Sequence, residues 1–562
     1  MRDFVRIVRA WAETYPERLA CSMAGDQPGR ETYLSYAELD AAARRLGSEL
    51  LERGLQGERA VLLLQPGLSY VIALFGCWYA GVTAVPVYAP RQNSSIERVR
   101  VIQENAQARV IISTAQGFVG LEDGLAASVQ RLDIDALTPG SEAQWRMPDI
   151  GEDTLAVLQY TSGSTGQPKG VQLRHRHLVE NCRIISAVLE ATPEDVGVFW
   201  IPPYHDMGLI GGILHCIYGR FPVHLMAPAM FLQRPMRWLE AISRHRGTIT
   251  AAPNFAYDLC VRRARPDQIA QFDLSSWRVA VNGAEPVRAD TLRRFAETFA
   301  PARFDIRTFY PSFGMAETTL LVTGGSYTRR SHSMLADREG MATGRVIAVE
   351  QDGVELVSSG RRGPGVDIAI VDPVSLQRCE PGKVGEIWIS GATVADGYWQ
   401  RPDATQETFG GRLAGSDANW LRTGDLGVLH EDELIVTGRI KDLIIIRGSN
   451  HYPHDIEATA LAAHPALRPN GAAAFALETA DGEGLGLVLE MDRGTDAEDR
   501  AQARTAVLDA VSRDHQLQVA QLVFVKANSI PKTSSGKVQR GRTRERLLAG
   551  ELIVLNEEEV AA

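Results

Sequence analysis

In the first third of the chain, segments whose apolar residues recur with the period of a helix are followed by segments with the pattern of a strand. A helix is predicted from a capping box of Ser35 and Glu38 to a glycine stop at Gly54. Its apolar face comprises Tyr36, Leu39, Ala43, Leu46 and Leu50. Short apolar runs at 60–64, 85–88, 110–112 and 154–160 predict strands separated by helix-length segments. This order predicts a layered α/β fold with a largely parallel sheet.

The pattern changes in the last 40% or so of the chain. VDIAIVDP, GEIWIS and a Gly/Pro-rich interval between 363 and 409 indicate a β-rich part at about 340–438. Strands are then predicted at 434–437, 443–446 and near 485–490 and 522–525, with helices near 453–464 and before the last strand. We therefore expect an N-terminal domain, 1–438, and a small α+β C-terminal domain, 439–562, joined by a short hinge.

The charge-free stretch 60–90 is long enough to include a membrane span, because 68–85 alone could cross a bilayer. Gln65-Pro66-Gly67, Gly76, Gly81 and Pro86 interrupt it, however. We therefore predict a buried strand, helix and strand in this stretch and no membrane span.

Composition narrows the possible partners and the compartment. The 562 residues include 59 Lys and Arg against 69 Asp and Glu, a net charge of −10, and no basic stripe that would favour nucleic acid. The six cysteines include no CxxC pair, so neither a disulfide framework nor a zinc site is supported. The charged N-terminus does not resemble a secretory signal. A cytoplasmic location is expected.

The densest chemical signal is the run Tyr160-Thr-Ser-Gly-Ser-Thr-Gly-Gln-Pro-Lys169-Gly170. It follows a predicted strand and precedes the helix that contains Leu178. Its hydroxyls and glycines can wrap anionic oxygens while Lys169 supplies charge; they are Thr161, Ser162, Gly163, Ser164, Thr165 and Gly166. The run is not a Walker A loop, because Pro168 stands five residues after Gly163. It predicts a polyphosphate-binding loop, and a plain polar surface loop is the alternative.

With this loop, the chain resembles the acyl-adenylate-forming superfamily of acyl-CoA synthetases, luciferases and peptide-synthetase adenylation domains. Five further segments resemble motifs of that superfamily, in the expected order: Asn282-Gly-Ala-Glu-Pro286, Phe313-Gly-Met-Ala-Glu-Thr318, Trp420-Leu-Arg-Thr-Gly-Asp425, Gly438-Arg-Ile-Lys-Asp442 and Pro531-Lys-Thr-Ser-Ser-Gly-Lys537. The resemblance covers nearly the whole chain. It implies a large adenylation domain and a mobile C-terminal lid that use ATP and Mg²⁺.

The resemblance also assigns roles to residues. Lys537 would bridge the substrate carboxylate and the α-phosphate, Lys169 would bind phosphate, and His205 would line the carboxylate pocket. Glu317 would hold Mg²⁺ and Lys441 would be the hinge residue. The nucleotide would contact the 161–166 loop and the following residues: Gly283, Ala284, Glu285, Phe313, Gly314, Met315, Ala316, Asp425 and Arg439.

Taken singly, several of these residues also fit ordinary structural roles. Glu317 could start a helix, Asp425 could cap a turn, Phe313 could be core and Lys441 could be a solvated surface lysine. His205 is followed by Asp206, and we expect this segment to be extended. Adjacent side chains would then point to opposite faces, so joint action or a metal at this pair is not expected.

Within the superfamily, the likeness is strongest to fatty acyl-AMP ligases, which pass the acyl group to a carrier protein. PPYHDMGLIGG, GRIKDLIIIRGSNHYPHDIE and Ala316 carry this likeness. So does a long connection after Glu317 that corresponds to the family's insertion, at about 324–355. No Gly-x-x-Ser attachment signature follows Lys537, so we expect a separate acyl carrier protein, in polyketide or lipopeptide biosynthesis.

Two alternatives stay open beside a fatty acyl-AMP ligase. One is an acyl-CoA synthetase, and the other is a catalytically silent adenylate-binding module. The apolar run 210–232 could be the wall of an acyl pocket or ordinary core.

Overall fold

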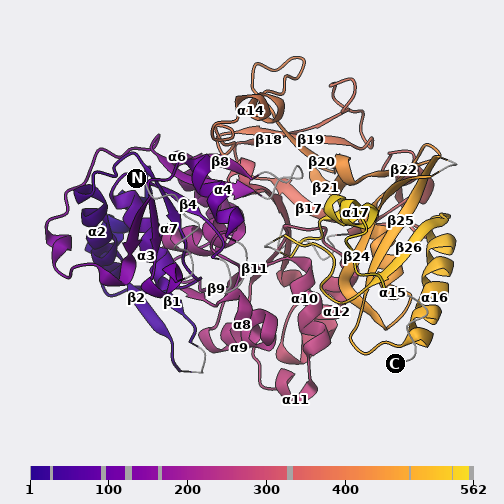
Figure 1. Cartoon of the computed structure of the whole chain (residues 1–562), viewed down its shortest axis with the longest axis horizontal. Coiled ribbons are helices and arrows are strands. Elements are labelled where there is room, and N and C mark those ends of the chain that lie inside the picture. Colours follow the sequence, from indigo (N-terminus) through magenta and orange to yellow (C-terminus); the bar gives the residue numbers. More distant parts are fainter. Residues whose placement is uncertain are drawn as a thin grey trace. The chain divides into compact units, whose positions relative to one another are not determined.

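A computed structural model describes residues 2–25, 29–89, 96–119, 129–161, 168–325, 333–479, 482–533 and 536–555. Its backbone divides into two compact units. The first comprises Met1–His332, Val357–Ala369 and Trp388–Arg422, and the second comprises Ser333–Leu356, Ile370–Ile387 and Thr423–Ala562. Figure 1 colours the chain by sequence, so the first unit runs mostly from indigo to magenta. The sequence predicts a boundary at 438 between an N-terminal domain and a mobile C-terminal domain. This boundary stays a prediction.

One sheet of the first unit has the strand order β6-β5-β3-β4-β7-β8. Its strands are β3 (Arg59–Leu62), β4 (Thr83–Pro86), β5 (Val110–Ser113), β6 (Gln130–Asp133), β7 (Leu155–Thr161) and β8 (Lys169–Arg174). Neighbours are parallel except β7 and β8, which form an antiparallel pair. Helices α3 (Leu68–Tyr79) and α4 (Glu97–Ala106) provide crossovers between parallel strands. The predicted α/β class is confirmed.

The charge-free stretch forms a buried strand, helix and strand, as predicted. Helix α3 packs against α2 (Tyr36–Glu52), whose capping box of Ser35 and Glu38 is present. Within the described part of the chain, no helix is long and apolar enough to cross a membrane.

The second sheet of the first unit contains the strand path β14-β13-β12-β11-β9-β10-β1-β2. Its strands are β1 (Leu19–Met23), β2 (Thr32–Ser35), β9 (Gly197–Phe199), β10 (Val223–Leu225), β11 (Ile249–Ala252), β12 (Val279–Asn282), β13 (Phe309–Gly314) and β14 (Leu321–Gly324). The central strands from β1 to β13 are parallel. An aromatic cluster that includes Trp238, Tyr257 and Phe295 packs between this sheet and its helices.

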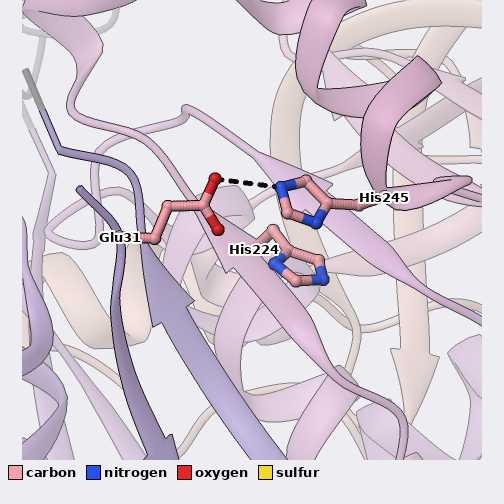
Figure 2. Close-up of side chains that lie close together, drawn as sticks. All are labelled: Glu31, His224 and His245. Atoms are coloured by element: carbon pink, nitrogen blue, oxygen red, sulfur yellow. Dashed lines mark hydrogen bonds and ion pairs between the residues drawn. The ribbon is translucent and has the colours of Figure 1, made fainter. Parts of the chain in front are cut away.

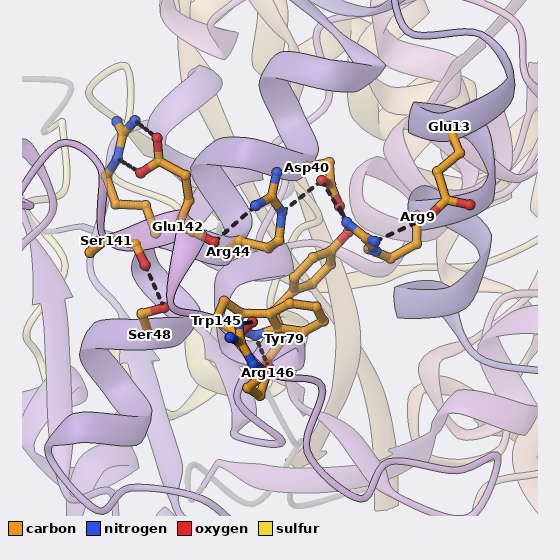
Figure 3. Close-up of polar contacts among 11 residues, drawn as sticks. Arg9, Glu13, Asp40, Arg44, Ser48, Tyr79, Ser141, Glu142, Trp145 and Arg146 are labelled. Atoms are coloured by element: carbon orange, nitrogen blue, oxygen red, sulfur yellow. Dashed lines mark hydrogen bonds and ion pairs between the residues drawn. The ribbon is translucent and has the colours of Figure 1, made fainter.

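A buried polar cluster ties the N-terminal helix α1 (Phe4–Thr14) to α2 and α3 (Figure 3). Asp40 accepts hydrogen bonds from Arg44 Nε at 2.8 Å, Arg9 Nη1 at 3.1 Å and the Tyr79 hydroxyl at 2.8 Å. Arg44 also donates to the carbonyl of Glu142, which brings the 141–146 segment into the cluster. Asp40 is only 3% exposed, so its charge depends on these donors.

The second unit contains a three-stranded sheet with helices α15 and α16 on one face. Strand β24 (Leu467–Thr479) is antiparallel to β25 (Gly482–Met491), and β25 is parallel to β26 (Val519–Val525). Ile456 of α15 (Pro453–Ala462) and Val507 of α16 (Ala497–His515) belong to the apolar core of this sheet. Figure 1 shows these elements together in orange and yellow.

Two hairpins and the expected insertion complete the second unit. The hairpins pair β20 (Leu421–His430) with β21 (Glu433–Arg439) and β22 (Ile444–Ile446) with β23 (Ser449–His451). Described from residue 333, the insertion forms β15 (Ser333–Ala336), α13 (Arg338–Ala342) and β16 (Ala348–Val349). Its Met341 and Val346 share a core cluster with Val428 of β20, Ile435 of β21 and Tyr452.

The remaining elements connect these layers. The helices are α5 (Ala115–Phe118), α6 (His175–Val188), α7 (His215–Gly219), α8 (Pro228–Gln233), α9 (Met236–His245), α10 (Asn254–Arg263), α11 (Pro266–Ile269), α12 (Ala289–Phe299), α14 (Pro402–Phe409) and α17 (Arg540–Leu548). The strands are β17 (Val354–Arg362), β18 (Val366–Val371) and β19 (Gly385–Gly391).

Candidate active site

The hydroxyl-rich loop is closed by a strand pair. Thr161 ends β7 and Lys169 begins β8, and the two residues are direct cross-strand partners. The loop residues Ser162, Gly163, Ser164, Thr165 and Gly166 lie outside the described residues. The sequence predicts that the loop leads straight into a helix, but β8 intervenes, because Val171 and Leu173 are buried and are separated by the polar Gln172. Lys169 is thereby fixed beside the end of a parallel strand, where α/β folds bind ligands.

Lys169 and Glu317 contact the same tyrosine, which the sequence patterns did not identify. The Tyr398 hydroxyl donates a 2.8 Å hydrogen bond to Glu317 Oε1, and the Lys169 ammonium lies 4.8 Å from the centre of the Tyr398 ring. Tyr398 and Glu317 are 6% and 7% exposed. Burial, followed by the nearby Glu317 charge, raises the pKa of Tyr398, so its hydroxyl remains a donor. This cluster joins two residues that were predicted separately.

The predicted adenine-binding segment adjoins the predicted aromatic motif. Strands β12 and β13 are parallel, with Asn282 opposite Pro311, so the residues after both strand ends lie together. A Cβ at Gly283 would lie 2.9 Å from the Ser312 carbonyl oxygen, which explains why glycine stands there. Ala284 has a φ of 68°, a conformation that costs a non-glycine residue free energy and is concentrated at functional sites. The structure therefore juxtaposes two of the predicted nucleotide-binding motifs.

The aromatic motif itself makes a tight turn that presents Glu317. Gly314 has no room for a side chain, since a Cβ would lie 1.9 Å from the Leu320 carbonyl oxygen. Thr319, with a φ of 70°, provides a second strained position. Phe313 and Met315 are half-buried, whereas Ala316 is buried. Phe313 is thus only partly absorbed into the core. Glu285 accepts a hydrogen bond from the Phe255 backbone N–H at 2.6 Å.

The expectation that His205 and Asp206 diverge is wrong. His205 Nδ1 lies 2.6 Å from Asp206 Oδ1, because the chain turns helical here instead of extended. The Leu209 N–H donates to the His205 carbonyl, and a π-helix follows over Met207–Leu214. Single π-helical turns are rare and often occur at functional sites. Asp206 therefore orients the imidazole through Nδ1.

The apolar run 210–232 is largely buried. Its side chains below 2% exposure include Ile210, Ile213, Leu214, Ile217, Phe221 and Phe231. Gly211 approaches the turn after Glu317, since a Cβ there would lie 3.2 Å from Leu320 Cδ2. Burial is compatible both with core packing and with the wall of an acyl pocket.

In the second unit, Asp425 and Arg439 form a cross-strand pair between β20 and β21. Arg439 Nε donates to Asp425 Oδ1 at 2.8 Å, and Asp425 is 6% exposed. The Thr423 hydroxyl accepts a hydrogen bond from the Asp425 N–H. Two residues predicted to contact ribose or phosphate are thus brought together. Lys441, the predicted hinge residue, follows directly in the exposed turn Ile440–Asp442.

Lys537 lies on a short hairpin. Lys532 forms an antiparallel bridge with Val538, and the Gln539 N–H donates to the Pro531 carbonyl. Closer to the tip, the Lys537 N–H donates to the Thr533 hydroxyl at 3.1 Å, and the Thr533 N–H donates to the Lys537 carbonyl at 2.8 Å. Thr533 thereby holds the Lys537 backbone from both sides.

A Glu–His–His cluster lies away from the predicted motifs, at the edge of the second sheet (Figure 2). Glu31 Oε1 lies 3.2 Å from His245 Nε2 and accepts a hydrogen bond from Arg244 at 3.0 Å. The rings of His224 and His245 are stacked, with centroids 3.7 Å apart and planes at 18°. A metal ion lies in the plane of each imidazole that binds it, and nearly parallel stacked rings cannot share such a point. The cluster therefore fits a structural role.

Together, the described motifs place a lysine, a buried glutamate and glycine-lined turns at strand ends, which is the arrangement of an adenylate-forming enzyme. The family model described as AMP-binding enzyme matches residues 8–399, and the model Disco-interacting protein 2-like, AMP domain, matches residues 441–557. The chain belongs to the AMP-binding enzyme family.

Individual relatives agree with this assignment. The chain is 42% identical over 535 residues to the medium-chain-fatty-acid acyl-carrier-protein ligase JamA of Moorena producens, covering 92% of this chain and 90% of that protein. It is 36% identical over 568 residues to the 4-hydroxyphenylalkanoate adenylyltransferase of Mycobacterium tuberculosis, covering 96% and 90%. The crystal structure of fatty acyl-adenylate ligase from L. pneumophila, in complex with acyl adenylate and pyrophosphate, matches with a TM-score of 0.78 and 36% identity. It covers 100% of this chain and 99% of that one. The predicted resemblance to fatty acyl-AMP ligases is confirmed.

Proposed function

We propose that the protein joins a fatty acid to AMP at the expense of ATP, releases pyrophosphate, and passes the acyl group to the phosphopantetheine thiol of a separate acyl carrier protein. The observation that carries this proposal is the cluster of Lys169, Tyr398 and Glu317, in a chain that matches an acyl-adenylate complex over its full length. JamA, named as an acyl-carrier-protein ligase, supports the choice of acceptor.

In the first half-reaction a carboxylate oxygen attacks the α-phosphorus of ATP. The bond from that phosphorus to the bridging oxygen breaks, and pyrophosphate leaves with the electron pair. Negative charge grows on the phosphorus oxygens and the leaving group, so fixed cations accelerate the step. Lys537 would neutralise the carboxylate and α-phosphate, and Lys169 with the 161–166 loop would hold the departing phosphates.

Glu317 fits a magnesium ion. Mg²⁺ bound to ATP takes one or two protein carboxylates and keeps several waters, and Glu317 supplies one buried carboxylate oriented by Tyr398. When bound, the ion would neutralise phosphate charge. The nucleoside would lie against Phe313 and the 283–285 turn, with its ribose hydroxyls on Asp425 and Arg439.

His205 would line the carboxylate end of the acyl site, with its ring set by Asp206. The apolar run 210–232 would contact the acyl chain. In the second half-reaction, the carrier thiolate attacks the acyl carbon and AMP leaves. Rotation at Lys441 would withdraw Lys537 and admit the thiol.

The insertion supports acyl transfer to a carrier protein. Met341 and Val346 pack against Val428 and Ile435, which precede Lys441, and against Tyr452, which follows it. Packing on both sides of the predicted hinge residue would restrict its rotation. Such restriction would favour a carrier protein over free CoA as the acceptor, because a carrier protein is large enough to hold the lid in place itself.

A carboxylate panel tests the proposal. The protein is incubated with ATP, Mg²⁺ and acids from C2 to C18, together with aryl alkanoates, and acyl-AMP is quantified by mass spectrometry. We expect acyl-AMP from a fatty acid and at least a hundredfold less from Lys537→Ala, because one lost transition-state donor costs about 3 kcal/mol. Acyl-AMP from no acid in the panel would overturn the proposal. We also propose that the protein acts in the cytoplasm.

A further inference from the structure

Glu490 is a fully buried carboxylate in the second unit that none of the assigned roles uses. It lies on β25 opposite Val525 of β26 and is 0% exposed. A buried charge is costly unless it is paired and hydrogen-bonded, so its presence calls for a specific explanation.

Two of its contacts are with residues at the base of the hairpin that carries Lys537, and a third is with Arg468 of β24. Glu490 Oε1 accepts a hydrogen bond from the Ile530 backbone N–H at 2.9 Å. Its Oε2 lies 3.8 Å from Lys532 Nζ and 3.5 Å from Arg468 Nε. Ile530 and Lys532 flank Pro531, the first residue of the Lys537 motif. One buried side chain therefore fixes the point where the hairpin leaves the sheet.

A bulge in the neighbouring strand completes this base. The register between β24 and β25 shifts between Leu467 and Ala472, and the extra residues bring Arg468 to Glu490. Asn470 Nδ2 approaches the Gly536 carbonyl at 3.5 Å, one residue before Lys537. At Gly471 an added Cβ would lie 2.8 Å from Glu490 Cβ, so the bulge closes directly over the carboxylate.

The Glu490 carboxylate also faces the partly buried ammonium of Lys532. Burial lowers the pKa of Lys532, and the Glu490 carboxylate opposes that effect. Without the carboxylate, the partly buried ammonium would move toward solvent and carry residues 531–533 with it. Thr533 bonds to the Lys537 backbone at both N–H and carbonyl, so such a displacement would reach Lys537.

The geometry points to Glu490 as the positioning residue for Lys537 in acyl-AMP formation, with Lys532 as its counter-ion. This inference rests on the proposed function. Glu490 touches no reacting atom; it determines where the Lys537 ammonium stands. A displacement of about 1 Å at a reacting centre can cost a hundredfold in rate.

Glu490→Gln tests the inference, because glutamine keeps an acceptor for the Ile530 N–H and removes the charge. The matched control is Glu478→Gln, an exposed glutamate of β24 in the same sheet. Two rates are measured: pyrophosphate release with decanoic acid and ATP, and acyl transfer from synthetic decanoyl-AMP to a phosphopantetheinylated acyl carrier protein. We expect Glu490→Gln to lower the first kcat roughly tenfold to a hundredfold with little change in KM, and the second rate less than twofold. The control should change neither.

A normal first rate in a folded Glu490→Gln protein would overturn the inference and leave the proposed function standing. An equal fall in both rates would also overturn it, because that marks a general structural role. If wild-type protein releases no pyrophosphate with any acid of the panel, the proposed function fails, and this inference with it. If Glu490→Gln does not fold, Lys532→Gln removes the same charge interaction by changing its more exposed partner. It must show the same split between the two rates.

Discussion

Tyr398→Phe isolates the link between Tyr398 and Glu317. The substitution removes the hydroxyl that donates to Glu317 Oε1 at 2.8 Å and keeps the ring that faces Lys169. A hydrogen bond to a charged group contributes about 1.5–3 kcal/mol, and 1.4 kcal/mol is a tenfold change in binding. If the hydroxyl orients Glu317 toward Mg²⁺, the metal affinity of the site should fall roughly tenfold to a hundredfold.

The assay is the initial rate of pyrophosphate release at fixed ATP and fatty acid across a range of free Mg²⁺. We expect the half-saturating Mg²⁺ concentration to rise at least about tenfold in Tyr398→Phe, while the rate at saturating Mg²⁺ stays within about threefold of wild type. Tyr33→Phe is the control, since it removes a hydroxyl that also donates a 2.8 Å hydrogen bond to a glutamate, Glu31, in the cluster that lies away from the predicted motifs.

A double-mutant cycle with Glu317→Gln makes the result specific. Tyr398→Phe should have little further effect on Mg²⁺ dependence in the Glu317→Gln background, because the two residues act as one unit. Unchanged Mg²⁺ dependence in Tyr398→Phe, or fully additive effects in the double variant, would show that the Tyr398 hydroxyl does not orient Glu317 for Mg²⁺.

Three further predictions concern catalysis, packing and pH. Lys537→Ala should raise the activation free energy of pyrophosphate release by about 3–4 kcal/mol, as measured from the rate at saturating ATP. A near-normal rate would show that Lys537 takes no part in the mechanism. Asp40→Asn should destabilise the first unit by roughly 1.5–3 kcal/mol, because it removes the buried charge that accepts hydrogen bonds from the partly exposed Arg9 and Arg44. Thermal unfolding measures this loss of stability. The control Glu13→Gln, on the exposed side of Arg9, should change the unfolding midpoint little. Equal midpoints for Asp40→Asn and wild type would contradict the prediction. Burial and then the neighbouring His245 lower the pKa of His224 to about 4, so the folded protein resists a proton that the unfolded chain binds below about pH 6.5. Stability should therefore fall on acidification from pH 7.5 to 5 by about 2 kcal/mol through this residue. His224→Asn should lessen that fall in urea titrations at the two pH values, and an identical pH dependence would exclude the assignment.

Local sequence patterns predicted the parallel sheet and the position of most motifs. The charge-free stretch was resolved correctly because Pro66, Gly67 and Gly81 mark the ends of its elements. The sequence patterns do not predict strand β8, since its six residues, between a glycine-rich loop and a helix, carry only two buried side chains, Val171 and Leu173.

Contacts between distant segments could not be predicted in this way. Tyr398 and Glu317 are 81 positions apart, and no spacing rule connects them. In the sequence, Glu490 is a polar residue near a strand end, and no pattern indicates that Ile530 and Lys532 lie beside it. The prediction that the side chains of His205 and Asp206 diverge is wrong because the local backbone is helical. This conformation accompanies the burial of the apolar residues that follow. Pairings of this kind depend on tertiary packing, whereas motif order depends on sequence alone.

The proposed function has two parts: this chain makes acyl-AMP, and it delivers the acyl group to a carrier thiol. The most direct measurement is a competition. Acyl-AMP is first allowed to accumulate with ATP, Mg²⁺ and decanoic acid, and equal concentrations of CoA and a phosphopantetheinylated bacterial acyl carrier protein are then added together. We expect acyl-AMP before the chase, and afterwards at least about ten times more acylated carrier than acyl-CoA by mass spectrometry, a preference of about 1.4 kcal/mol. Predominant acyl-CoA, or no acyl-AMP before the chase, would contradict it.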